Sequence, residues 1–203
     1  NVDVQISVGL FHAGYPMQGP KGPCRGITDL EQLQKTGNWG WFHELGHESQ
    51  RRPDKAWGWN NPYTFDGSVE CTVNFFSAHA LNRLGIQFDH GWGWTTHPDK
   101  VEQRARKVTD TELSYAQADV GTKLAMVLQV RDAFGWKPIA ATLKSYSDDQ
   151  DSAPDRLPKD NQQKRDQFCL RLSRQLGHNL SPFMSQLWGI EVSPQIAEQL
   201  QPL

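Results

Sequence analysis

The segment His43-Glu44-Leu45-Gly46-His47 constrains the fold of this chain more than any other feature of its sequence. It has the pattern H-E-x-x-H, and residues i and i+4 of a helix lie on one face about 6 Å apart, so both imidazoles can bind one tetrahedral zinc ion. Glu44 then flanks the open coordination position. With 7 His in 203 residues, chance produces this pattern on the order of 0.01 times per chain. The sequence therefore predicts a helix that carries two zinc ligands, His43 and His47, and a general base, Glu44.

Glu70 is the predicted third zinc ligand. It follows His47 by 23 positions, near the start of a second predicted helix over residues 67–85. The apolar stripe of that helix consists of Val69, Val73, Phe76, Ala80 and Leu84. Glu70 lies beside this stripe, so it can face the first helix while the stripe packs. Asn74, one turn further, is placed to hydrogen-bond to a ligating histidine. Gly46 has no side chain, which lets the two helices approach closely.

Plainer interpretations of these residues stay open. His43 and His47 can be histidines on a solvated helix face, and Glu70 can be an acidic residue favoured at a helix start by the macrodipole. The other histidines lack ligand spacing and are expected to be structural: His12, His79, His90, His97 and His178.

Charge and hydropathy exclude several classes of protein. There are 21 Lys and Arg against 23 Asp and Glu, which gives a net charge of -2. This balance provides no basic surface for nucleic acid or an anionic membrane. No apolar run approaches the roughly 18 to 20 residues that span a bilayer. With 37% hydrophobic residues, we expect one globular domain over residues 1–203 with an ordinary core.

The periodicity predicts an α+β chain that is predominantly helical, with a short N-terminal β segment. Alternating apolar residues predict a strand over 2–12, and Gly and Pro predict a loop over 13–26. Residues 145–161 are polar and are predicted to be a mobile loop. Further helices are predicted over 28–35, 98–108, 111–134 and from about 168 to Gly177, with two short ones opened by Pro182 and Pro194.

Eight Trp are present, and six of them form the pairs Trp39/Trp41, Trp57/Trp59 and Trp92/Trp94. In extended backbone this spacing puts both rings on one side. Such clusters either pack in a core or bind ligands. The candidate substrate contacts are Trp57, Trp59, Trp92, Trp94 and Tyr63.

The three cysteines, Cys24, Cys71 and Cys169, show no C-x-x-C spacing, which excludes a Cys-based zinc knuckle and a redox motif. One disulfide plus a free thiol is compatible with this count, and the pairing of Cys24 with Cys71 or with Cys169 stays open. The chain starts at Asn1 without a basic-then-apolar leader, so we expect a mature product or an excised domain.

The zinc segment resembles the enhancin-like (M-sixty) metallopeptidases, which are gluzincins. The resemblance rests on Trp39-Gly40-Trp41-Phe42 before the H-E-x-x-H pattern, on Gln50, and on Glu70-Cys71-Thr72-Val73-Asn74-Phe75-Phe76. Further similarity covers nearly the whole chain, at His12-Ala13-Gly14-Tyr15-Pro16, Phe134-Gly135-Trp136, Leu180-Ser181-Pro182-Phe183 and Trp188-Gly189-Ile190.

This resemblance implies a zincin-like catalytic domain with zinc bound by His43, His47 and Glu70, and with Glu44 as the base. Family members are mostly secreted or cell-surface peptidases, and several cleave mucin-like O-glycosylated proteins. The resemblance therefore implies a secreted mucinase, or O-glycopeptidase, with glycoprotein or peptide substrates. The family domain normally has more β-rich sequence before the segment that corresponds to residues 2–17, so we expect this chain to be a piece of a longer protein.

Two other functions stay open at this point. A non-catalytic glycan- or protein-binding module on a metallopeptidase fold is one, as the channel-associated eukaryotic relatives of the family suggest. A metallohydrolase that acts on a small amide is the other. For the peptidase itself, the residue that stabilises the oxyanion is left open among Tyr63, His79, His90 and Tyr115.

Overall fold

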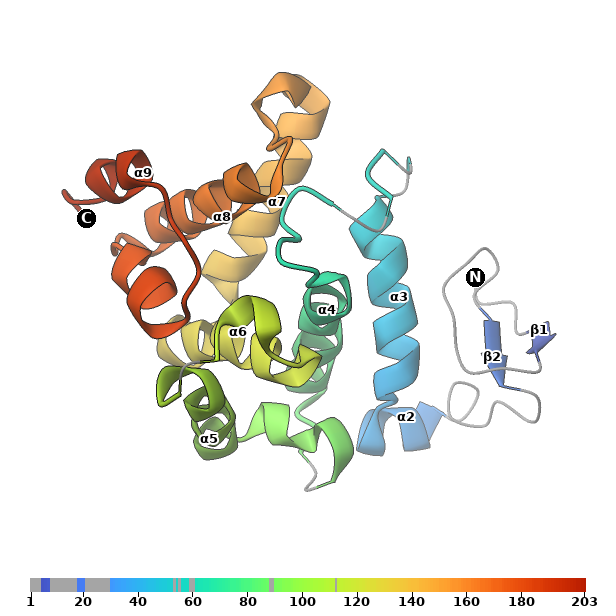
Figure 1. Ribbon diagram of the computed structural model, residues 1–203. Coiled ribbons are helices and arrows are strands. Elements are labelled where there is room, and N and C mark those ends of the chain that lie inside the picture. The colour runs from blue at the N-terminus through green and yellow to red at the C-terminus, as the bar shows by residue number, and fades with distance from the viewer. Residues whose placement is uncertain are drawn as a thin grey trace. The chain divides into compact units, whose positions relative to one another are not determined.

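The computed structural model describes residues 5–7, 18–20, 30–52, 54, 56–58, 61–87, 90–111 and 113–203. They form a predominantly helical chain (Figure 1), as the sequence predicts. None of the helices in these ranges combines the length and the apolar character needed to cross a membrane. The chain divides into two compact units, one of residues 1–61 and 72–97 and the other of residues 62–71 and 98–203. The expectation of a single domain stays a prediction.

The first unit contains a two-stranded parallel sheet and helices that precede or carry the H-E-x-x-H segment. Strand β1 (Gln5–Ser7) pairs with β2 (Gln18–Pro20), so the expected strand over 2–12 is described only at these three residues. Helix α2 (Leu30–Thr36) leads into α3 (Trp39–Arg51). Asn38 starts α3 because its side chain accepts a hydrogen bond from the backbone N–H of Trp41 at 3.1 Å.

Helix α3 packs against α4 (Val69–Leu84), and the two helices run side by side in Figure 1. The close approach depends on Gly46. A Cβ atom at that position would lie 2.7 Å from the Val73 side chain and 2.9 Å from the Val73 carbonyl oxygen. The role predicted for Gly46, which is to admit the second helix, therefore has a measurable geometric basis. Helix α4 ends at Gly85, whose φ of +67° suits glycine.

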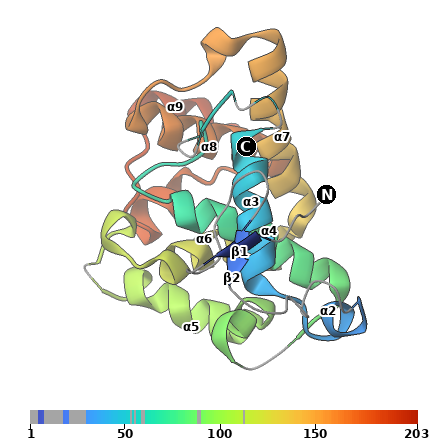
Figure 2. The same cartoon turned by 90° about the vertical axis from the view of Figure 1, so that its right-hand side faces the viewer.

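The second unit is built around α6 (Val120–Phe134). Helix α6 packs against α5 (Pro98–Thr109) and α7 (Trp136–Ser152), and α7 packs against α8 (Asn161–Leu176); Figure 2 shows α5 and α6 side by side. Ten residues of α6, on every face of the helix, are buried, which is typical of a central helix. The remaining elements of this unit are the short turns η2 (Tyr115–Gln117) and η3 (Pro154–Arg156), the π-helical turn η4 (Phe183–Leu187) and helix α9 (Pro194–Gln199).

The prediction of a mobile loop over 145–161 is wrong for residues 145–152, which are helical. Helix α7 continues to Ser152, and only a short connection separates it from α8. The polar stretch is helical because it is amphipathic: Ile139, Thr142 and Tyr146 are buried, while Asp149 pairs with Arg171 of α8 at 2.6 Å. The polarity of residues 147–152 therefore belongs to a solvated helix face.

Other boundaries differ less from the prediction. The helix expected over 111–134 begins only at Val120, after the turn η2, because Asp119 provides the N-cap by accepting from the Thr122 N–H at 2.9 Å. Helix α5 matches its predicted range. Helix α8 ends at Gly177 in the left-handed conformation, as predicted, but it begins at Asn161, earlier than expected. Cys71 and Cys169 are buried free thiols, and Cys24 lies outside the described residues.

Candidate metal centre

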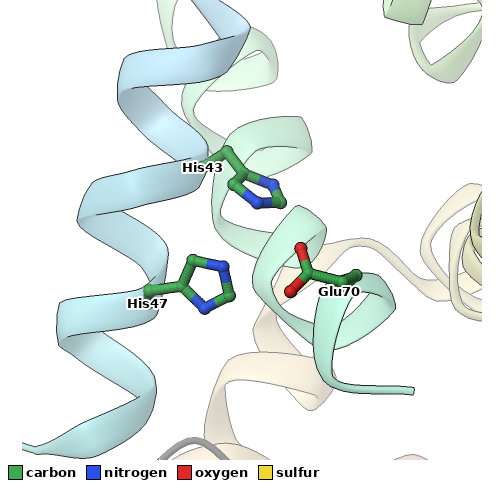
Figure 3. Close-up of side chains that lie close together, drawn as sticks. All are labelled: His43, His47 and Glu70. Carbon is green, nitrogen blue, oxygen red and sulfur yellow. The ribbon is translucent and has the colours of Figure 1, made fainter. Parts of the chain in front are cut away.

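Three candidate metal ligands come together on α3 and on the first turn of α4. His43 and His47 lie one turn apart on α3, and Glu70 is the second residue of α4. Their ligand atoms all lie within 4.8 Å of one another. In Figure 3 both imidazoles point from α3 toward the carboxylate of Glu70. Within the part of the chain that the structure describes, this is the one His, Cys, Asp and Glu group with such geometry.

The ring of His43 is held by Asn74. Its Nδ1 lies 2.8 Å from Oδ1 of Asn74, which is 1% exposed on α4. An amide oxygen only accepts, so the tautomer with a proton on Nδ1 makes this bond and turns Nε2 into the ligand nitrogen. The structure thus shows the hydrogen bond between Asn74 and a candidate ligand that the sequence predicts.

The ring of His47 is held by a chain of two hydrogen bonds. Its Nδ1 lies 3.0 Å from Oε1 of Gln50, and Nε2 of Gln50 donates to Oγ1 of Thr72 at 2.6 Å. Gln50 and Thr72 are almost fully buried, so these two hydrogen bonds are protected from water. Sequence reasoning missed both positioning roles, although Gln50 lies three residues after His47 and thus on an adjacent position of the same helix face.

The two glutamates of the site differ in burial. Glu44 is 7% exposed, and His47 is 8% exposed. Glu70 is exposed and lies in the first turn of α4. Two imidazoles and one carboxylate are the ligand set of a catalytic zinc site that keeps a fourth position open.

The residues present fit a zinc ion. Bonds of about 2.0 to 2.2 Å in a tetrahedron put ligand atoms roughly 3.4 Å apart. The 4.8 Å bound is wider, so the ligand side chains would move closer together on binding the ion. Amide hydrogen bonds already orient both histidines, which is the arrangement that ligating histidines need.

Two of the tryptophan pairs, Trp39/Trp41 and Trp92/Trp94, do not lie in extended backbone. Trp39 and Trp41 are helical, and Trp92 and Trp94 belong to the turn η1 (Gly91–Thr96). Stacking instead joins Trp39 to Trp92, with ring centroids 4.7 Å apart and planes 2° from parallel. Because Trp39 lies one turn before His43, the stacked pair extends the face of α3 that carries the ligands.

The other candidate substrate contacts lie in varied surroundings. Trp57 is half-buried, with the guanidinium of Arg52 5.3 Å from its ring centroid, and Trp59 lies outside the described residues. Trp94 is tilted against Trp92 at 6.1 Å. Tyr63 is 2% exposed and packs against Tyr146 in the second unit.

The four oxyanion candidates also separate by burial. Tyr63 and Tyr115 are buried in the second unit, where burial raises the pKa of both phenols well above the usual value. His79 and His90 are exposed. Burial is the main reason why the pKa of His79 is lowered, and the positive charge of the nearby Arg83 lowers it further.

Comparison with known proteins finds a matching family and curated relatives. The sequence profile of the family described as Peptidase M60, enhancin and enhancin-like, matches residues 1–189. TRPM8 channel-associated factor 2 of Homo sapiens is 30% identical over 202 residues, and a TRPM8 channel-associated factor homolog of Danio rerio is 30% identical over the same length. Each match covers 99% of this chain and 20% of the relative, so the chain spans about a fifth of the length of these curated relatives.

Two solved structures share the fold. They are crystal structures of a functionally unknown conserved protein from Bacillus anthracis str. Ames and of its mutant. The TM-scores are 0.77 and 0.74, at 22% and 23% identity, and both matches cover 98% of this chain and 38% of the other.

Proposed function

The chain belongs to the Peptidase M60, enhancin and enhancin-like, family, and from this membership we propose that it is a zinc-dependent endopeptidase of the gluzincin type with a zincin-like fold. Its proposed substrates are O-glycosylated, mucin-like proteins, and its proposed location is outside the cell or on its surface.

One observation carries the catalytic part of this proposal. The ligand atoms of His43, His47 and Glu70 lie within 4.8 Å of one another, and the Nδ1 atoms of both histidines are held by amide oxygens. A pair of histidines on a solvated helix has no need of two buried amides that fix its rings. The arrangement therefore supports a working zinc site.

The proposed role of each residue follows from its chemistry. His43, His47 and Glu70 would hold the zinc ion, which when bound lowers the pKa of a water molecule and polarises the scissile carbonyl. Glu44 takes the proton from the attacking water and passes it to the leaving amine. Its burial, with 7% exposed, keeps that proton transfer away from bulk water.

The test combines metal content with turnover. We expect close to one zinc per chain by elemental mass spectrometry in protein purified without added metal, and cleavage of O-glycosylated peptides. Glu44→Gln should keep the zinc and lose about 10² to 10⁴-fold in kcat. A folded wild-type protein without zinc would contradict the proposal, as would a Glu44→Gln variant with unchanged turnover.

The glycan preference rests on the family and on the aromatic rings near α3. Stacking of a sugar on Trp92 or Trp94 uses the apolar ring face. We expect Trp92→Ala to lower the ratio of cleavage of a glycosylated peptide to that of the same bare peptide. Trp136→Ala, a half-buried tryptophan of the second unit, is the control and should leave that ratio unchanged. Equal ratios in wild type, Trp92→Ala and Trp136→Ala would show that Trp92 does not bind the sugar by stacking.

A second candidate function comes from the names of the relatives. The proteins that match at 30% identity are named TRPM8 channel-associated factors, so a non-catalytic protein- or glycan-binding module is the alternative. Chain-length preference on peptide libraries separates an endopeptidase from an amidase of small substrates. The binding module would be favoured by two results together. The zinc-loaded wild-type protein would cleave no glycopeptide, and the Glu44→Gln variant would bind glycopeptides with the same affinity as wild type.

A further inference from the structure

The turn that leads into α4 is held unusually firmly. Phe65, Asp66, Gly67 and Ser68 form a tight turn in which the Ser68 N–H donates to the Phe65 carbonyl at 3.0 Å. Both central residues have positive φ, 50° at Asp66 and 66° at Gly67. This is the pattern of a type I′ turn, for which Asp-Gly is a favoured sequence. Helix α4 begins at Val69, directly after it.

Every polar group of Asp66 has a partner in the second unit. Arg165 donates from Nε to Oδ2 at 2.9 Å and from Nη2 to Oδ1. Asn161 donates from Nδ2 to Oδ1 at 2.8 Å, and its Oδ1 accepts from the Asp66 N–H at 2.9 Å. Lys123 donates from Nζ to the Asp66 carbonyl at 2.6 Å. Arg165 and Asn161 belong to α8 and Lys123 to α6, so two helices fix one turn residue.

This arrangement has a higher cost in free energy than an ordinary exposed turn. The side chain of Asp66 is 6% exposed and that of Arg165 is 19% exposed, so two charges are largely withdrawn from water. The left-handed backbone of a residue other than glycine adds conformational energy, and such residues persist where their surroundings over-determine them. The hydrogen bond to Asp66 is the main reason why the pKa of Arg165 is raised, which is consistent with a tight pair.

The turn sets the start of α4, and Glu70 lies in the first turn of that helix, four positions after Asp66. Glu70 is exposed, and the backbone of the helix start sets where the base of its side chain lies. We propose that Asp66, clamped by Arg165, Asn161 and Lys123, is a positioning residue for the zinc ligand Glu70. This inference rests on the proposed zinc site.

The variant Asp66→Asn tests the proposal. Asn tolerates the left-handed backbone and removes the charge that Arg165 binds. We expect the dissociation constant for zinc to rise about tenfold or more, as when partners that orient metal ligands are lost. We also expect the visible spectrum of the Co²⁺-substituted protein to change. The matched control is Asp149→Asn, because Asp149 forms a similar half-buried pair with Arg171, also on α8. It should lower the melting temperature yet leave zinc affinity within about twofold of wild type.

A second variant keeps the test decisive where Asp66→Asn fails to fold. Arg165→Lys keeps the charge but loses the fork that binds both oxygens, and we expect a smaller rise of the zinc dissociation constant. Wild-type affinity in the folded variants, with Glu70→Gln weakened, would overturn the clamp and leave the zinc site standing. Wild-type protein that binds no zinc, or a Glu70→Gln variant with unchanged affinity, would overturn the proposed function and the clamp together.

Discussion

Nδ1 of His43 lies 2.8 Å from Oδ1 of Asn74, which follows it by 31 positions in the chain. Asn74 is one turn after Glu70 on α4, so a single helix carries a candidate metal ligand and the group that orients another. The neutral amide oxygen fixes the ring without adding a negative charge. A zinc ion held by two imidazoles and one carboxylate would leave the site with a net charge of about +1, which would favour a developing oxyanion.

Removal of the Asn74 side chain should weaken zinc binding. We expect Asn74→Ala to raise the zinc dissociation constant about 10 to 100-fold, because the His43 ring loses the acceptor that fixes its tautomer. Competition against a chromophoric chelator measures this. Asn74→Asp keeps an acceptor at the same place and should bind zinc at least as tightly as wild type. If Asn74→Ala binds zinc like wild type, His43 is oriented by something else.

A methyl group at Gly46 should destabilise the packing of α3 on α4. The Cβ of Gly46→Ala would meet the Val73 carbonyl oxygen at 2.9 Å, and this backbone atom cannot move aside cheaply. Overpacking of this kind costs about 1 to 3 kcal/mol. Urea unfolding with a chelator present measures it. Ser49→Ala, on the exposed side of α3, should change stability by under about 0.5 kcal/mol.

Asp119 should make stability depend on pH. Burial raises the pKa of its carboxyl, but hydrogen bonds from Thr122 and Arg104 outweigh this and hold the pKa well below the usual range. A carboxyl whose folded pKa is depressed contributes stability that is present above the unfolded value, near 4, and is lost as the pH falls toward the folded value.

Asp119→Asn isolates this effect, because Asn still caps the start of α6 but carries no charge. We expect the variant to be less stable than wild type at pH 7, and we expect the difference to shrink as the pH falls from about 4 to 2. Thermal unfolding across this range measures it. A difference of the same size at pH 7 and pH 2 would show that the charge of Asp119 is not responsible.

The thiols of Cys71 and Cys169 should be inert in the native protein. Both side chains are buried, and burial raises the pKa of each to about 12. Thiolate is the reactive form, and it is scarce at neutral pH in such a site. In a Cys24→Ser background, a thiol reagent should label neither cysteine until denaturant is added. Rapid native labelling would place at least one of them nearer to solvent.

The candidate metal ligands could be predicted from sequence because the metal dictates their spacing. The distance of one helical turn between His43 and His47 follows from tetrahedral coordination, and Glu70 was the acidic residue on the next predicted helix. Gln50 and Thr72 escaped prediction because a buried amide-to-hydroxyl hydrogen bond leaves no periodic pattern. Their pairing depends on how α3 and α4 dock, which local sequence does not encode.

The helices with strong start and stop signals were also predictable. Pro98, Gly85 and Gly177 mark boundaries that the structure confirms. The loop predicted over 145–161 is wrong for residues 145–152 because polar composition alone does not distinguish a loop from a solvated helix face. Tyr146 is buried seven positions after Ile139, so a helix period is present there, and the pair of Asp149 with Arg171 comes from a helix further along the chain.

The packing of α3 against α4 has a consequence for the stability of the protein and for its resistance to proteolysis. Glu70 is 23 positions away from His47, so one zinc ion would act as a reversible cross-link that closes the intervening stretch of chain. Free zinc at 100 times its dissociation constant would add about 2.7 kcal/mol to the stability of the folded form. The supply of zinc would then influence how fast proteases degrade the protein.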